Sequence, residues 1–321
     1  MSSSLRRAIG LLGACVVAAM AAHMGLSMLL GGLMVALFKP GSYINPPYLG
    51  VPFLYIYLLD DVELAKRAFF VSELFYAAFL LLLARGGSFL SSLREAAAGR
   101  PSSLLQNGLA LLLLSYGVTL FLSLLASSAS EAAGVPVGTL PKDDPIMQFI
   151  GVSLAPINEE VTFRLLLLGL PAALLLRAKA PGSANFLRML WRPSSGAQGR
   201  VPASLHALVA LSSAIFGLAH LAGGWEPGKF FPAAIAGAAL GELYVYVGLH
   251  AAIMLHWSFN YYNTVSYYWG QTAPSLITSL YDQASSAFEL VASLASLLLL
   301  SFVAFERLFT IRLKLPRPAG L

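Results

Sequence analysis

Long apolar runs separated by short polar stretches dominate the pattern of this chain. A helix needs about 20 apolar residues to cross the hydrocarbon core of a bilayer. Most of the eight runs approach or exceed this length, and the shorter seventh run is expected to lie inside a helix bundle. The pattern predicts an all-α fold, a polytopic transmembrane helix bundle with about eight spans. The predicted spans lie near 8–38, 68–84, 104–126, 146–176, 201–222, 230–248, 250–262 and 284–305.

The composition supports a membrane protein and excludes two other classes. Of the 321 residues, 58% are hydrophobic and only 11% are charged, whereas a soluble domain carries about 25% charged residues. So few charges could not cover a water-soluble globule, and intrinsic disorder requires low hydrophobicity. We divide the chain into N-terminal transmembrane helices (1–145), a helical core (146–262), and an outer loop, last transmembrane helix and basic cytoplasmic tail (263–321).

The first apolar run is expected to be a membrane-spanning helix rather than a signal peptide. It continues to Phe38 and is far longer than the apolar region of a signal peptide. The stretch Leu12-Gly13-Ala14-Cys15 is faintly similar to a lipoprotein cleavage box, so a cleaved or lipidated N-terminus is the alternative. Because Cys15 is the single cysteine, an intrachain disulfide and a cysteine-based zinc site are excluded.

The positive charges predict the orientation of the bundle. With eight spans and a cytoplasmic N-terminus, fourteen of the twenty lysines and arginines fall on the cytoplasmic side and five on the outer side. Cytoplasmic loops of membrane proteins carry an excess of these residues. We therefore expect both termini in the cytoplasm, and we attribute the net charge of +5 to the loops rather than to nucleic-acid binding. The largest basic cluster follows span four and contains Arg177, Lys179, Arg188, Arg192 and Arg200.

Charged residues inside a span are the first candidates for function, because each costs about 2.5–3.5 kcal/mol at the bilayer centre. The fourth span carries Glu159, Glu160 and Arg164 within six residues. Glu160 and Arg164 are four positions apart on one helix face and can neutralise each other. Glu159 lies about 100° away around the helix. It is left in an apolar setting, where a carboxylate can serve as a general base. A purely structural ion pair is the alternative.

Two later spans add further polar side chains. Near the end of span five, Phe216 is followed four positions later by His220, and span seven carries His256 and Asn260, also four positions apart. His256 and Asn260 therefore point the same way. Together with Glu159, these residues supply a base, two imidazoles and an amide donor, which are the groups needed to activate water and to stabilise an oxyanion.

The three motifs, in this order, resemble those of the CPBP intramembrane proteases. They read EExxxR, FxxxH and HxxxN on separate membrane helices, and the resemblance covers about 146–262. This family includes type II CAAX prenyl endopeptidases, bacteriocin-processing and immunity proteins, and myxosortases. The resemblance implies an intramembrane endopeptidase that cleaves a membrane-anchored protein or peptide.

The resemblance also implies a role for each residue. Glu159 and His220 would polarise the attacking water, and His256 and Asn260 would stabilise the tetrahedral oxyanion. The supporting residues that order the site would be Glu160, Arg164 and Phe216.

The cofactor is left open by the sequence. We favour a glutamate mechanism that needs none. The alternative is a divalent metal, since two histidines and a carboxylate are an acceptable zinc set, and the ligands would then be Glu159, His220 and His256. The zincin signature HExxH does not occur in the sequence.

Two other functions fit part of the pattern. Buried carboxylates and histidines also build the proton relays of transporters, although no internal repeat typical of such carriers is visible. A non-catalytic immunity or scaffold protein could retain the family fold. Outside the motifs, Glu73 and Glu289 are expected to be structural or interfacial, whereas Glu242 is either close to the site or paired with a neighbour.

The orientation predicts the side from which substrate arrives. His220 falls near the outer end of span five, and Glu159 is roughly 20 Å from the outer start of span four. The site is expected inside the membrane, displaced toward the outer leaflet, with a membrane-anchored tail or leader as substrate. A composition rich in Ala, Leu and Gly but poor in Lys is typical of a bacterial protein, which predicts the inner membrane. The partners expected are this substrate and the lipid bilayer, without nucleic acid.

Overall fold

The computed structural model describes residues 3–39, 48–51, 54–57, 61–85, 88–139, 144–179, 185–197 and 199–314. Two basic residues used for the orientation, Lys142 and Arg317, lie outside these ranges, as does the end of the predicted basic tail. The described residues are overwhelmingly helical, which confirms the all-α prediction. A short antiparallel pair of strands, β1 (Tyr48–Val51) and β2 (Leu54–Tyr57), is an addition that the apolar pattern did not predict.

Six helical segments of the described chain are long and apolar enough to cross a membrane. They coincide with six of the predicted spans and confirm an integral, multi-pass membrane protein. They are α1 (Ser3–Leu37), α2 (Val62–Arg85), α4 (Gly108–Ala132), the continuous helix formed by α5 (Pro145–Glu160), η2 (Val161–Gly169) and α6 (Leu170–Lys179), then α8 (Ala203–Ala222) and α12 (Leu276–Lys314).

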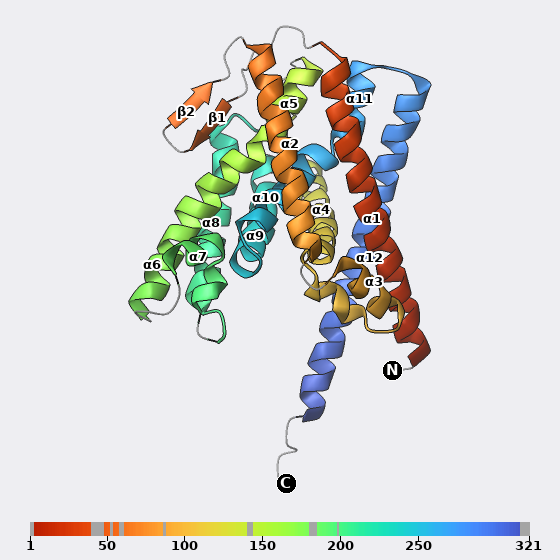
Figure 1. Cartoon of the computed structure of the whole chain (residues 1–321), viewed down its shortest axis with the longest axis vertical. Helices are drawn as coiled ribbons and strands as arrows, with labels where there is room; N and C mark the ends of the chain where they lie inside the picture. Colours follow the sequence, from red (N-terminus) through yellow and green to blue (C-terminus); the bar gives the residue numbers. More distant parts are fainter. Residues whose placement is uncertain are drawn as a thin grey trace.

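Two shorter helices occupy the remaining predicted spans. They are α9 (Phe230–Tyr246) and α10 (Leu249–Trp257), and the π-helical segment η5 (Ser258–Tyr262) continues α10. Both are shorter than the roughly 20 residues that a span requires, so the number of eight spans stays a prediction. Figure 1 shows α10 in the middle of the bundle, and all its residues except His250 are buried.

Short elements connect the long helices at both ends of the bundle. Figure 1 shows α3 (Phe89–Ala97) and α7 (Phe186–Trp191) at its lower end, and α11 (Val265–Thr272) at its upper end. Helix α1 begins and α12 ends at the lower end, as an even number of crossings requires. The assignment of this end to the cytoplasm stays a prediction. The other short elements are η1 (Pro101–Gln106), η3 (Pro193–Gly196) and η4 (Pro227–Lys229).

The helix that carries the two adjacent glutamates has a sharply defined start. The Asp144 carboxylate accepts hydrogen bonds from the backbone N–H groups of Ile146 and Met147, both at 3.0 Å. Pro145 occupies the first helical position, where its missing N–H would have had no partner in any case. Such a cap contributes about 1 kcal/mol. It also fixes where α5 begins, and therefore at which level of the bundle Glu159 lies.

Helices α8 and α9 approach each other closely because α9 presents glycines to α8. A Cβ atom at Gly237 would lie 3.0 Å from the Cα of Ser213, and one at Gly241 would lie 2.7 Å from a methyl group of Val209. Small residues at such interfaces let the backbones of membrane helices come together. As a result, the backbone carbonyl of Gly237 reaches the buried charges described below.

The predicted orientation can be tested by labelling with a membrane-impermeant maleimide, in a chain whose native cysteine is replaced (Cys15→Ser). Glu226, in the loop after α8, and Arg200, before α8, are both exposed. We expect Glu226→Cys to be labelled in intact cells and Arg200→Cys only after the membrane is opened. The opposite labelling pattern would contradict the orientation.

Candidate active site

Glu160 is the centre of a buried network of charged side chains. Its Oε2 atom lies 3.1 Å from Nε of Arg164, and its Oε1 atom lies 2.8 Å from Nδ1 of His256. The side chains of Glu160 and Arg164 are completely buried. The predicted pairing of these two residues across one helical turn is confirmed. The contact with His256, from a helix 96 residues further along, joins α5 to α10.

Arg164 is compensated by more than its carboxylate partner. Its guanidinium donates to the backbone carbonyl of Gly237 at 3.1 Å and lies over the ring of Phe216, 4.7 Å from the centroid. Removing a charge from water costs several kcal/mol unless partners replace the lost hydration. An ion pair, a carbonyl and an aromatic face supply part of this compensation, while Nε and Nη1 of Arg164 form no hydrogen bond within the described chain. Arg164 thereby links its own helix to α8 and α9.

Glu159 lies in a different environment from its neighbour. Its side chain is 29% exposed, whereas that of Glu160 is fully buried. Its Oε2 atom is 3.8 Å from Nε2 of His256, too far for a hydrogen bond but close enough for electrostatic attraction if the imidazole is protonated. Of the two adjacent glutamate side chains, only that of Glu159 is partly exposed.

The hydrogen bonds of His256 define which of its nitrogens carries the proton. The Asn260 Nδ2 atom lies 3.3 Å from Nε2 of His256. An amide nitrogen can only donate, so Nε2 is the unprotonated nitrogen. The Nδ1–H group then donates to Glu160. His256 is therefore held between a sealed carboxylate on one side and Asn260 and Glu159 on the other.

His220 approaches the same place from α8. Its Nδ1 atom lies 2.9 Å from the carbonyl oxygen of Phe216, four positions earlier, and the two rings are 4.7 Å apart. The Phe216 ring also packs edge-on against His256, with centroids 5.8 Å apart. Glu159, His256 and Lys229 are the ionisable groups that act electrostatically on the His220 ring. The structure thus brings together the side chains of all three motifs around Phe216.

Two π-helical segments flank the acidic and amide residues of the site. One, η2, begins directly after Glu160, and the other, η5, contains Asn260. Near each segment, a side-chain hydroxyl donates a hydrogen bond to a backbone carbonyl. Thr162 donates to the carbonyl of Asn158 at 3.0 Å, and Ser258 donates to the carbonyl of Met254 at 2.8 Å. π-Helical turns are rare and occur often at functional sites, where they re-aim a side chain.

Lys229 and Trp225 are site neighbours that the sequence analysis did not single out. The Lys229 ammonium lies 4.2 Å from the centre of the Trp225 ring, and that ring is 6.4 Å from His220. Burial lowers the pKa of Lys229, and the negative charge of Glu159 opposes this shift. In the sequence, Lys229 counted only as a basic residue of an outer loop. Its place beside the motifs depends on how that loop folds back, which no spacing rule predicts.

The other intramembrane acids are paired away from these residues. Glu242 hydrogen-bonds His206 at 2.8 Å, so the neighbour-pair interpretation of Glu242 holds. Glu289 accepts from the Tyr116 hydroxyl at 2.9 Å. The hydroxyl of Tyr261, next to Asn260, lies 3.3 Å from Glu73 on α2 and 2.9 Å from the carbonyl of Met28 on α1.

Tyr262 is anchored in a similar way. Its hydroxyl lies 2.9 Å from Nδ1 of His23 on α1, and Nε2 of His23 lies 3.2 Å from the hydroxyl of Ser285 on α12. The π-helical segment that holds Asn260 is therefore tied to helices far from it in the sequence.

The metal alternative depends on how closely these side chains are grouped. Among the residues that the structure describes, no three or more His, Cys, Asp or Glu side chains are grouped so that they could hold a metal ion. Glu159, His220 and His256, the ligands considered from the sequence, are not such a group, and the choice between a metal and a glutamate mechanism stays a prediction.

A comparison with protein families identifies the segment that holds this site. Residues 141–262 match the family model described as type II CAAX prenyl endopeptidase Rce1-like. The resemblance to CPBP proteases is confirmed over this segment, which contains Glu159, Glu160, Arg164, Phe216, His220, His256 and Asn260. Comparison with curated proteins and with solved structures found no match. Because the matching model describes an endopeptidase, the match supports a peptidase embedded in the membrane.

The buried network predicts a large effect of neutralising Glu160. Glu160→Gln leaves Arg164 buried without its counter-charge, which we expect to destabilise the protein by about 3–5 kcal/mol in an unfolding measurement in detergent. Glu159→Gln is the matched control, because the same change one residue away affects a partly exposed side chain. We expect this control to cost less than about 1 kcal/mol. Equal stability of the two variants would contradict the central role of Glu160.

Proposed function

We propose that the protein is an intramembrane endopeptidase that hydrolyses a peptide bond of a membrane-associated protein. The observation that carries the proposal is the difference between the two adjacent carboxylates. Glu160 is sealed between Arg164 and His256, while the side chain of Glu159 is partly exposed and lies beside His256 and His220. A site in which one acid is structural and its neighbour can reach water is suited to general-base catalysis.

In the proposed reaction Glu159 takes a proton from a water molecule while the water oxygen attacks the carbonyl carbon of the scissile peptide bond. His220, beside Glu159, orients this water. The tetrahedral intermediate then collapses as Glu159 passes the proton to the departing amine, and the C–N bond breaks. Such proton transfers by a positioned side chain contribute about 10²–10⁴-fold in rate.

His256 and Asn260 are proposed to stabilise the oxyanion. The Asn260 amide has an N–H group to offer once it turns from His256 toward the substrate. His256 can donate from Nε2 only if it is protonated there, and the Glu160 carboxylate at its Nδ1 would stabilise that imidazolium. Glu160 then has two roles, since it neutralises Arg164 and holds His256 ready to accept charge.

The substrate is proposed to reach the site from the outer face. In the predicted orientation His220 lies near the outer end of α8, and the loop with Trp225 and Lys229 follows it on that side. A prenylated CAAX protein would instead arrive from the cytosol. We therefore infer a membrane-anchored tail or leader as substrate, as in a sorting or leader-processing protease. We place the protein in the inner membrane of a bacterium, on the basis of its composition.

The role of Glu159 predicts a loss of activity without a loss of fold. Cells that produce Glu159→Gln should lack the new membrane-protein termini that appear with the wild-type chain, and the purified variant should cleave such a substrate about 10²–10⁴-fold more slowly. Glu242→Gln is the control, because it removes an acid that pairs with His206 away from the site. A Glu159→Gln variant that cleaves as fast as wild type would refute the mechanism.

The proposed mechanism also predicts that metal removal has no effect. His256 already directs one nitrogen to Glu160, and no three-ligand group is present in the described part of the chain. Treatment of the purified enzyme with EDTA and then 1,10-phenanthroline should leave the cleavage rate unchanged. A loss of activity that zinc restores would contradict the metal-free mechanism while leaving the peptidase assignment in place.

A further inference from the structure

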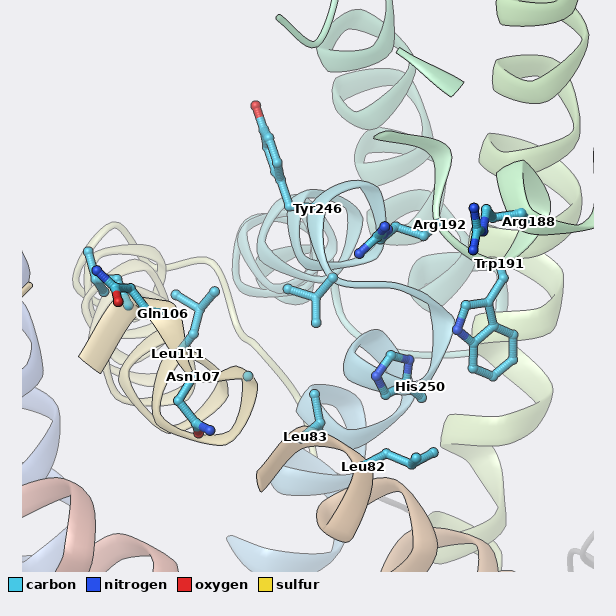
Figure 2. Close-up of a pocket in the computed structure, with 13 residues that line it drawn as sticks. Leu82, Leu83, Gln106, Asn107, Leu111, Arg188, Trp191, Arg192, Tyr246 and His250 are labelled. Carbon is cyan, nitrogen blue, oxygen red and sulfur yellow. The ribbon is translucent and has the colours of Figure 1, made fainter. Parts of the chain in front are cut away.

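A second candidate site lies at the other end of the bundle, away from the motif residues. A pocket of about 720 Å³ opens where α2 ends, where α4 and α10 begin, and beside α7. Figure 2 shows the lining side chains arranged around this space. Its volume falls in the range of pockets that bind small molecules, about 300–1,000 Å³. None of the residues that form the motifs lines it.

The charge of this pocket is positive. Arg188 and Arg192 line it, and none of its described lining residues is an aspartate or glutamate. Neither guanidinium forms an ion pair within the described parts of the chain. In Figure 2, Arg192 directs its guanidinium toward the space between Tyr246 and His250. Two uncompensated arginines at a concave site are suited to a phosphate group, which arginine binds through paired N–H donors.

One wall of the pocket is rigid and aromatic. The rings of Trp191 and His250 are stacked, with centroids 5.4 Å apart and an angle of 7° between their planes. The chain turns between α9 and α10 at Gly248, whose φ of 131° favours glycine. A Cβ atom at Gly248 would lie 3.1 Å from both the Trp191 carbonyl oxygen and Nδ1 of His250. This turn therefore brings the stacked pair into place as a fixed wall.

Another part of the lining is apolar. It is formed by Leu82, Leu83 and Leu111 together with Val247, and Leu82 is half exposed on the outside of the bundle. The pocket thus combines two cations with an apolar surface that continues outward from α2. A ligand that satisfies both must carry a negative head and an apolar tail.

We propose that this pocket binds the phosphate headgroup of an anionic phospholipid, with its acyl chains leaving along the apolar wall. In the predicted orientation the pocket lies at the cytoplasmic face, whose leaflet is rich in anionic lipids, and basic pockets between helices on that side bind such headgroups. The site is independent of the proposed peptidase reaction. The two are connected mechanically, because His250 in the pocket and His256 in the site belong to the same short helix.

The proposal is tested first on the wild-type protein purified in detergent. Native mass spectrometry with added phosphatidylglycerol and phosphatidylcholine should show preferential retention of phosphatidylglycerol. Excess inorganic phosphate should not reproduce the stabilisation that phosphatidylglycerol gives in thermal unfolding, since it lacks the apolar part. Equal retention of both lipids, or full stabilisation by phosphate alone, would overturn the proposal.

The second measurement compares two double variants with equal loss of charge. Arg188→Gln with Arg192→Gln removes the pocket cations, and we expect retention of phosphatidylglycerol to fall about tenfold or more. Arg177→Gln with Arg200→Gln removes two exposed arginines of the same predicted loop that do not line the pocket, and retention should be unchanged. If both variants lose retention equally, surface charge rather than the pocket binds the lipid. If the pocket variant does not fold, the wild-type lipid competition still decides the question.

Discussion

The burial of one carboxylate, that of Glu160, constrains the rest of the core. A fully buried charge must be neutralised and hydrogen-bonded, or the bundle does not form. Glu160 forms an ion pair with Arg164 on its own helix and accepts a hydrogen bond from His256 on α10. Arg164 in turn contacts the Phe216 ring on α8 and the backbone carbonyl of Gly237 on α9. The helices that carry the motifs are therefore held together by the electrostatics of the bundle interior, and the chemistry proposed for Glu159 is added to this structural framework.

Much of the architecture could be predicted from the sequence because membrane helices obey simple rules. Apolar run length predicted the positions of the long helices, and four-residue spacing predicted the Glu160–Arg164 pair. The contact between Glu160 and His256 could not be derived in this way, since it depends on the packing of helices 96 residues apart. The sequence resemblance assigned both residues to one site but gave His256 a role at the oxyanion, not as a partner of Glu160. The π-helical turns and the place of Lys229 also depend on tertiary packing.

The bundle is electrostatically different at its two ends. One end presents Arg188 and Arg192 at a pocket with an apolar wall, and the loop after α8 at the other end presents Lys229, held against an aromatic ring. Helix α10 runs from the first of these regions to the motif residues and is almost completely enclosed. A short helix with no lipid-facing surface is positioned only by its protein neighbours, so its depth and rotation respond to changes at either end.

Tyr261 and Tyr262 connect the core to the outlying helices, which are α1 and α2, outside the matched segment. Their hydroxyls contact α1 and α2, yet both tyrosines sit at the very end of the family segment, 141–262. That segment is therefore not a transplantable module. A graft of it into a foreign scaffold would leave two phenols without acceptors in an apolar interior, and Asn260 beside them would lose its fixed direction. The outlying helices and the two tyrosines are thus expected to change in concert among related chains.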